Sequence, residues 1–465
     1  MSKKKKEVDL FNQPVPKKEK IKKEVKSCDR DPSVTLNVEQ EEALILMKEF
    51  RKDKDKTDFV LKGSGGTGKS FLIKELFKRK KQKSDEYYVP STVIGVCVTH
   101  QARLNLMKSI PNTTTYASAA NLILMYDPMG NIYFSEKSGS HQLSELKSYS
   151  DIVVDECSMF DKQMQENLRK CCNPNAKIIW MGDSSQLPPI SACGDNDSPT
   201  FDIKDQYELT IKMRQDNEDH IAILADEVIS HIKGDKDLSF LNNLTQQYDV
   251  TTRKGYSITQ FDKVIPSYIS NFKKGIDVRI TSYRNTRIQS LNTAIRQHLW
   301  EEDADKQYVP GDLIIMNSQY SPDRDILAYN GQTFCIQRIY TDMVEFVECF
   351  MIVVPRVDRK PKSHETVTLQ VPTEKGYPMY KHHLEKLKKE AIKHKEWGEH
   401  QQFKNQFADI SYGYAVTNYK IQGSTLTGCY VDLSDILSVK PISDKRKLQA
   451  FYVGISRPTD FLAIF

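Results

Sequence analysis

The strongest constraint on the fold is a glycine-rich segment at residues 63–70, which reads Gly-Ser-Gly-Gly-Thr-Gly-Lys-Ser. It has the G-x-x-x-x-G-K-[ST] spacing of a phosphate-binding loop, a pattern that is specific only when a strand precedes it and a helix follows. Residues 58–62 have the apolar pattern of a short strand, and residues 71–77 have that of a helix. The backbone N–H groups of such a loop turn towards a polyphosphate, which the helix N-terminus also attracts. The segment therefore predicts a nucleotide site.

This loop supplies most of the predicted nucleotide ligands, which are Gly63, Gly65, Gly66, Thr67, Gly68, Lys69 and Ser70. Lys69 is expected to reach the β- and γ-phosphates, and Ser70 is expected to help hold Mg²⁺. Another apolar strand, residues 151–154, ends in the carboxylates Asp155 and Glu156. Ligands of parallel sheets bind at the carboxyl ends of the strands, so both carboxylates are expected beside the loop. Asp155 would hold Mg²⁺, and Glu156 would be the general base for the attacking water.

Short apolar segments alternate with helical ones, which predicts an α/β fold with parallel sheets. An amphipathic helix is expected from Leu36 to Phe50, with Asn37 as its cap. The predicted strands fall into two sets, at residues 58–62, 93–98, 151–154 and 177–181, and at residues 278–283, 429–433 and 461–465. A polar loop after the fourth strand carries Gln186, which suits a sensor of the γ-phosphate. A proline-rich turn explains that loop equally well.

Two segments interrupt this alternation. Residues 124–136 have a Pro-x-Gly-Asn centre between aromatic residues and predict a small hairpin, with a plain surface hairpin as the alternative to a functional one. Residues 308–372 look β-rich, with strands expected at residues 313–316, 332–339 and 343–347. Residues 377–407 look helical and highly charged. The middle of the chain therefore predicts an insertion into the second α/β domain.

Composition limits the number of domains and the place where a nucleic-acid site can lie. A length of 465 residues suits about three domains. The net charge of +5 arises at the N-terminus, because residues 1–30 hold 10 Lys and 1 Arg against 5 acidic residues, a net of +6. Any nucleic-acid site must therefore be a local groove, and the basic tail is expected to be disordered. It would serve as a solubilising arm, a nucleic-acid anchor or a nuclear import signal.

The sequence also indicates the cellular compartment in which the protein is expected. It has no apolar stretch near the roughly 18 residues of a membrane span, and no apolar segment of a secretory signal follows the basic start. Its nine cysteines include no C-x-x-C pair, which argues against a zinc site or a disulfide framework. We therefore expect an intracellular, cytoplasmic protein without a membrane partner, with a nuclear location left open by the tail.

Six segments in order together resemble the motif series of superfamily 1 DNA helicases, namely residues 63–70, 155–159, 182–189, 213–215, 420–424 and 452–457. Within that superfamily they look like the RecD-like branch, and within the branch like the phage Dda-type helicases. The resemblance covers roughly residues 34–465. It implies two RecA-like parallel-sheet domains around an ATP cleft, a hairpin insertion in the first domain, and an SH3-like plus helical insertion in the second.

The implied boundaries are a tail at residues 1–33, a first RecA-like domain at 34–208 with a hairpin wedge at about 121–148, a second at 209–305 and 411–465, and an insertion at 306–410. The resemblance also implies nucleotide-site residues beyond the loop. Gln40 would read the adenine of ATP, and Gly423 would complete the site. Arg214 and Arg457 would reach the γ-phosphate from the second domain and join Lys69, Glu156 and Gln186 in catalysis.

The strand-binding residues that the resemblance implies are Thr99, His100, Thr115, Phe134, Thr281, Asn285, Thr417, Tyr419 and Lys420. Hydroxyl and ammonium groups would hold phosphates without reading sequence, and Tyr419 would offer a stacking face. The family usually has His where this chain has Tyr419, and another His where it has Ala117. These departures concern the grip on the strand and leave the phosphate site intact.

The resemblance implies a monomeric, ATP- and Mg²⁺-dependent DNA helicase that moves 5′ to 3′ on single-stranded DNA and opens forks. Single-strand-binding or replication proteins would be its partners, in DNA replication or repair. Three alternatives remain: a nucleic-acid-dependent ATPase or translocase that does not unwind, a degenerate nucleic-acid clamp, and a P-loop enzyme that remodels proteins or phosphorylates small molecules. Nucleic-acid-stimulated hydrolysis and fork unwinding separate them.

Overall fold

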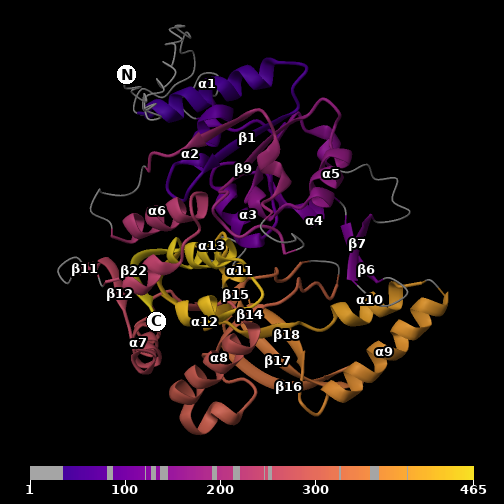
Figure 1. Cartoon of the computed structure of the whole chain (residues 1–465). Coiled ribbons are helices and arrows are strands. Elements are labelled where there is room, and N and C mark those ends of the chain that lie inside the picture. Colours follow the sequence, from indigo (N-terminus) through magenta and orange to yellow (C-terminus); the bar gives the residue numbers. More distant parts are fainter. Residues whose placement is uncertain are drawn as a thin grey trace, which may run out of the picture.

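Two six-stranded sheets form the centre of the molecule (Figure 1). The computed structural model describes residues 35–80, 87–120, 122–126, 132–136, 145–190, 196–212, 220–245, 247–249, 254–323, 326–356, 366–394 and 396–465. The predicted basic tail lies outside these residues. Within them, no helix is both long and apolar enough to cross a bilayer.

The first sheet is parallel throughout, in the order β10-β1-β9-β8-β4-β5. Its strands are β1 (Asp58–Gly63), β4 (Val93–Cys97), β5 (Thr113–Thr115), β8 (Asp151–Asp155), β9 (Lys177–Gly182) and β10 (Gln206–Leu209). Helices of this domain are α1 (Val38–Lys52), α2 (Lys69–Phe77), α3 (His100–Met107), α4 (Tyr116–Ala119) and α5 (Lys162–Cys171). The sequence predicted β1, β4, β8 and β9. It did not predict β5 or β10, because both are short edge strands with polar residues.

The start and the buried face of helix α1 are both determined by local sequence. Asn37 caps the helix by accepting from the Gln40 backbone N–H, and the Gln40 side chain accepts from the Asn37 N–H in return. This capping box satisfies two amide groups that the first turn would otherwise leave unpaired. The predicted apolar face, with Ala43 and Met47 fully buried, packs into the domain core beside α2.

The second sheet has the order β11-β12-β22-β21-β13-β20, and only its edge pair β11–β12 is antiparallel. Its strands are β11 (Gln247–Asp249), β12 (Lys254–Ile258), β13 (Val278–Ser282), β20 (Ala415–Thr417), β21 (Leu426–Val431) and β22 (Pro458–Ile464). Its helices are α6 (His220–Lys233), α7 (Phe261–Lys273), α8 (Asn285–Trp300), α11 (Asn418–Ile421), α12 (Leu433–Ser438) and α13 (Asp444–Ile455). The expected strand at 429–433 ends earlier, because the Asp432 side chain caps α12.

The insertion consists of two small antiparallel sheets and a pair of helices. One sheet has β14 (Leu313–Met316) between β15 (Thr333–Cys335) and β19 (Ile410–Tyr412); the other has β17 (Val347–Pro355) between β16 (Arg338–Val344) and β18 (Thr366–Pro372). The prediction of a strand at 343–347 was wrong, because the chain turns there between β16 and β17, with Glu345 at φ 55°. Helices α9 (Tyr377–His394) and α10 (Gly398–Asn405) follow β18.

Short elements complete the described chain. Two two-stranded ribbons are formed by β2 (Arg79–Lys80) with β3 (Tyr87–Tyr88), and by β6 (Leu122–Tyr126) with β7 (Ile132–Glu136). The second ribbon lies where the hairpin is expected, and Figure 1 shows it extending from the first domain on the side that carries α10. Single 3₁₀ turns occur at η1 (Glu145–Ser148), η2 (Cys157–Met159), η3 (Pro199–Asp202), η4 (Ser239–Asn243) and η5 (Glu301–Asp305).

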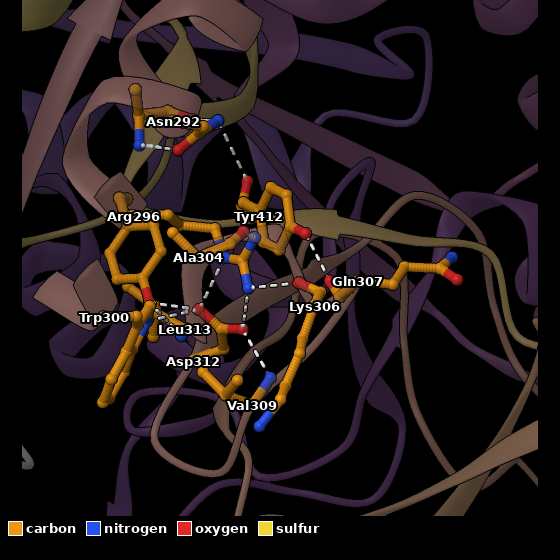
Figure 2. Close-up of polar contacts among 12 residues, drawn as sticks. Asn292, Arg296, Trp300, Ala304, Lys306, Gln307, Val309, Asp312, Leu313 and Tyr412 are labelled. Atoms are coloured by element: carbon orange, nitrogen blue, oxygen red, sulfur yellow. Dashed lines mark hydrogen bonds and ion pairs between the residues drawn. The ribbon is translucent and has the colours of Figure 1, made fainter. Parts of the chain in front are cut away.

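A buried polar cluster fixes the insertion to the second domain (Figure 2). Asp312 is fully buried at the start of the insertion, and Arg296 on α8 donates to both of its carboxylate oxygens at 3.1 Å. The Trp300 indole and the Tyr414 hydroxyl donate to the same carboxylate at 2.9 and 2.7 Å. The backbone N–H of Val309 gives a further bond of 2.8 Å. Every carboxylate lone pair thus has a donor, which is the condition for burying a charge.

This cluster generates a stability prediction. Asp312→Ala leaves the buried guanidinium of Arg296 without its counter-charge, and we expect the free energy of unfolding to fall by about 3–5 kcal/mol in urea denaturation. The matched control is Asp303→Ala, because Asp303 forms an exposed pair with Lys306 in the neighbouring segment. Equal losses from both variants would show that the cluster does not stabilise the junction.

Candidate functional site

The phosphate loop has the backbone that its glycines predict. Gly66 and Gly68 have φ of 85° and 86°, values that residues with a Cβ rarely adopt. A Cβ on Gly63 would lie 2.7 Å from the Thr67 hydroxyl and 2.9 Å from the Leu209 carbonyl. Helix α2 begins at Lys69, directly after the loop, so its N-terminal amides face the same space. Gly65 is exposed on the loop, and Thr67 is fully buried beneath it.

Lys69 lies folded against its own loop. Its ammonium donates to the carbonyls of Gly63 and Ser64 at 2.6 and 3.0 Å. Ser70, half-buried in the first turn of α2, follows Lys69 as the motif requires. Ser70 and the Asp155 carboxylate both offer hard oxygen ligands of the kind Mg²⁺ prefers. The residues present therefore fit a magnesium nucleotide.

The two carboxylates lie at the carboxyl end of β8, beside Lys69. Burial raises the pKa of Asp155, and the Lys69 charge opposes that rise. Burial, with the adjacent Asp155 charge, raises the pKa of Glu156 to about 7, while Arg457 acts in the opposite direction. Glu156 has φ 53° and ψ 44°, a strained conformation for a residue with a Cβ. A carboxylate held this way, near neutral pKa, suits a general base.

Two residues of the second domain, Tyr452 and Gln422, contact this edge of the first. The Tyr452 hydroxyl on α13 donates to Asp183 at 2.6 Å, and the Gly65 backbone amide of the phosphate loop opposes the rise in the pKa of that hydroxyl. The Gln422 amide donates to the Gln186 side chain at 3.0 Å and to Ser158 at 3.1 Å. These bonds join the loop after β9 directly to the second domain.

Gly423 lies at the same junction. It has φ 79°, and its carbonyl accepts from the Asn105 amide at 2.9 Å. A Cβ at this position would make ordinary contacts of 3.6 Å with a Glu156 carboxylate oxygen and with the Thr99 hydroxyl, so the positive φ is what favours glycine here. Gly423 lies beside the carboxylates, and a role on the nucleotide itself stays a prediction.

The structure places two of the other three predicted nucleotide-site residues, Arg457 and Gln40, in different surroundings. Arg457 is 8% exposed and donates to the Val453 carbonyl and the Ser456 hydroxyl within its own turn. Its charge nevertheless acts on Glu156 across the domain boundary. Gln40 is fully buried, and its amide donates to the Thr67 carbonyl at 3.1 Å, so it supports the phosphate loop from behind. Arg214 lies outside the described residues.

The predicted strand-binding threonines share a structural role that the sequence analysis missed. Thr99, Thr115 and Thr417 are the N-cap residues of α3, α4 and α11, and each side-chain oxygen accepts a backbone N–H three residues on. N-caps prefer Thr for this reason, so capping explains these residues without any ligand. The short helix α3 follows β4, α4 follows β5, and α11 follows β20.

The other predicted strand-binding residues divide into two groups. Thr281 is fully buried within β13, with its hydroxyl facing the Cys429 sulfur, so the prediction that it contacts DNA is wrong for this arrangement. Asn285 is exposed at the start of α8, and Lys420 is exposed on α11. Tyr419 is half-buried, with its ring packed edge-on against Tyr283. Phe134 belongs to β7, but its side chain lies outside the described structure.

His100 lies in an unexpected place. It is only 4% exposed, because the ring of Tyr329 from the insertion stacks on it with a centroid separation of 3.6 Å. Lys420 also contacts the insertion, through its ammonium and the Asn317 side chain at 2.7 Å. Sequence reasoning missed Tyr329 because it lies outside every motif. Tyr452 and Gln422 lie inside quoted motifs, so their position was a signal that could have identified them.

The fold and the site together define a P-loop nucleoside triphosphatase with two RecA-like domains. A family model described as an AAA domain matches residues 35–246. The uncharacterized protein R530 of Acanthamoeba polyphaga mimivirus is 24% identical, over 92% of this chain and 99% of that protein. The ATP-dependent DNA helicase Dda of Enterobacteria phage T4 is 24% identical, over 62% of this chain and 64% of the relative.

The architecture also matches a solved structure. A Pif1 helicase chain, from work on unwinding of forked duplex DNA by two coordinating Pif1 helicases, aligns over 92% of both chains with a TM-score of 0.51 and 13% identity. The predicted fold with two RecA-like domains is confirmed by this match. The predicted resemblance to superfamily 1 helicases of the RecD-like branch, with Dda among them, is confirmed as well.

The position of Glu156 generates a prediction about turnover. Glu156→Gln keeps the size and hydrogen bonding of the side chain but cannot accept a proton from water. We expect nucleoside triphosphate hydrolysis to slow by about 10²- to 10⁴-fold while nucleotide affinity is retained. Steady-state hydrolysis and fluorescent-nucleotide titration measure the two quantities. Lys69→Ala is the contrasting variant, since it should also weaken binding of the phosphates. A near-normal rate for Glu156→Gln would exclude Glu156 as the base.

Proposed function

We propose that this protein is an ATP-dependent DNA helicase that translocates 5′ to 3′ along single-stranded DNA and separates duplex strands. The observation that carries the proposal is the set of contacts joining the second domain to Asp183 and Gln186, in the loop after β9 beside the phosphate loop. A nucleotide site built into such a junction can convert hydrolysis into relative domain movement. Similarity to a phage helicase and to Pif1 supports the same activity.

The residues of this chain would perform hydrolysis in assigned roles. The phosphate loop and Lys69 would hold the β- and γ-phosphates, and Glu156 would accept a proton from the attacking water. Arg457 would stabilise charge on the γ-phosphate after its guanidinium leaves the Val453 carbonyl. Arg214 would assist from the second domain. Mg²⁺, held by Ser70 and Asp155, would neutralise phosphate charge when bound.

Gln186 would report the state of the γ-phosphate to the second domain. Its side-chain oxygen accepts from Gln422, which is 1% exposed, caps the end of α11 and lies two residues after Lys420. A shift of Gln186 towards the nucleotide must therefore break or move a buried hydrogen bond to the residue that ends α11. This link would pass hydrolysis to the part of the second domain predicted to hold the DNA strand.

The proposed ligands are single-stranded and forked DNA, with single-strand-binding or replication proteins as partners and a monomer as the working unit. Thr99, Thr115, Thr417, Asn285 and Lys420 would contribute to the strand path. The threonine hydroxyls accept cap bonds, and the O–H groups of Thr99 and Thr417 can still donate to a phosphate, whereas the Thr115 O–H donates to Ser118 at 3.0 Å. Binding would depend on backbone charge, so affinity should fall steeply with salt. Action inside the cell, in replication or repair, is part of the proposal.

The direction of translocation and the unwinding of duplex DNA can be tested with the same substrates. We expect ATP hydrolysis to be stimulated by single-stranded DNA, and a duplex with a 5′ single-stranded tail to be opened. The same duplex with a 3′ tail should stay closed, because the motor would move away from the junction. A strand-displacement assay with both substrates and an ATPase assay with and without single-stranded DNA measure these outcomes.

The results separate the alternatives. DNA-stimulated hydrolysis without strand displacement from either substrate would indicate a translocase that does not unwind. Opening of the 3′-tailed duplex alone would keep the helicase activity and reverse the proposed direction. Hydrolysis that DNA does not stimulate would favour a P-loop enzyme acting on another substrate.

The hairpin β6–β7 would act as the wedge that splits the duplex. Replacing residues 129–134 with a short Gly-Ser turn should therefore reduce unwinding to near background. DNA-stimulated ATPase should persist, because the hairpin lies outside the two sheets that form the nucleotide site. A matched control replaces Glu345 with Gly in the β16–β17 turn of the insertion, where the φ of 55° suits glycine. Equal unwinding by wild type and the hairpin variant would show that β6–β7 is a surface hairpin.

A further inference from the structure

The contact between His100 and Tyr329 joins two separately supported parts of the chain. His100 is the first residue of α3, directly after the N-cap Thr99, in the first domain. Tyr329 belongs to the connection between β14 and β15 in the insertion. The two rings lie nearly parallel, 7° apart, with centroids separated by 3.6 Å. The Arg103 guanidinium lies 5.5 Å from the centre of the same Tyr329 ring.

Each ring is held by its own domain. Tyr329 follows Ala328, which is fully buried in the insertion core and pairs with the almost fully buried Tyr320. The Tyr329 backbone N–H also donates to the Gln332 side chain at 3.0 Å. His100 is fixed by the capped start of α3, which packs against β4. A change in the distance between the two domains would therefore separate the rings without unfolding either support.

The groups near the His100–Tyr329 stack are of the kind that bind a nucleic-acid strand. The connection that carries Tyr329 begins with Asn317, which accepts from the Lys420 ammonium at 2.7 Å. This one connection thus touches two residues predicted to hold the strand, one from each RecA-like domain. Arg103 supplies positive charge beside the Tyr329 ring, and Lys420 supplies it at the start of the same connection. Positive charge and flat rings together bind single-stranded nucleic acid without sequence preference.

We propose that His100 and Tyr329 form a nucleobase-binding site, in which the rings separate and hold one base of a single strand between them. The proposal rests on the proposed function and adds a residue of the insertion to the strand path. Opening of the cleft between the domains would admit a base, and closing would return the rings to the stacked arrangement and expel it. The site would thereby make the grip on the strand depend on the hydrolysis cycle.

Base stacking can be tested apart from phosphate binding. Wild type is titrated with a fluorescent oligothymidylate and with an abasic deoxyribose-phosphate oligomer of the same length. We expect the oligomer with bases to bind more tightly by about 5- to 150-fold, the range of one base–aromatic stack. Tyr329→Ala should lose most of this difference while binding the abasic oligomer as wild type does. Tyr329→Phe should keep the difference, because the ring alone is required.

Tyr340→Ala is the matched control. Tyr340 is an exposed tyrosine on β16 of the same insertion, beside Arg338 and remote from the motifs. The Tyr340→Ala variant should bind both oligomers as tightly as wild type does. ATP hydrolysis without DNA should be unchanged in all three variants, which shows that the nucleotide site is intact.

Three outcomes would overturn the proposal. Tyr329→Ala with an unchanged preference for bases would show that the stack is only a domain contact. Tighter binding by Tyr329→Ala would show that the ring competes with DNA. Failure of wild type to bind either oligomer would refute the proposed function itself, and with it the base site. The first two outcomes leave the helicase proposal standing.

Discussion

The hydrogen bond from Tyr452 to Asp183 is the interaction on which the arrangement of the two halves depends. Both side chains are almost completely buried, at 1% and 4% exposure, and their atoms lie 2.6 Å apart. A buried carboxylate without such a donor would be strongly destabilising, so the bond holds α13 against the loop after β9. The Gly65 amide of the phosphate loop also acts on this hydroxyl and opposes the rise in its pKa, so the second domain meets the phosphate loop near the same point.

This constraint explains why the chemical residues gather where they do. Glu156 and Gln186 belong to loops at the carboxyl ends of neighbouring strands, β8 and β9, of the first sheet. Arg457 and Gln422 belong to segments that flank β22 and β21 of the second sheet. The domain contact brings these loops together. Burial and the adjacent Asp155 charge raise the pKa of Glu156, and Arg457 of the second domain opposes that rise.

The insertion is likewise held in position by contacts with both RecA-like domains. Asp312 and Arg296 fix it to α8, so its position follows that of the second domain. Tyr329 then reaches the first domain and stacks on His100. Contacts between the halves thus occur beside the phosphate loop and beside the predicted strand path, and ion pairs such as Lys445–Asp197 add to them.

Local patterns in the sequence determined the phosphate loop, the apolar strands β1, β4, β8 and β9, and the cap of α1. Each depends on neighbours along the chain: glycines that permit φ of 85°, apolar runs that bury, and Asn37 bonding to Gln40. Short polar edge strands such as β5 carry no such pattern, because their pairing is supplied by β4. The burial of Thr281 and the stack of Tyr329 on His100 were decided only by tertiary structure. Both involve residues distant in sequence, and no local preference specifies which distant surface a side chain will meet.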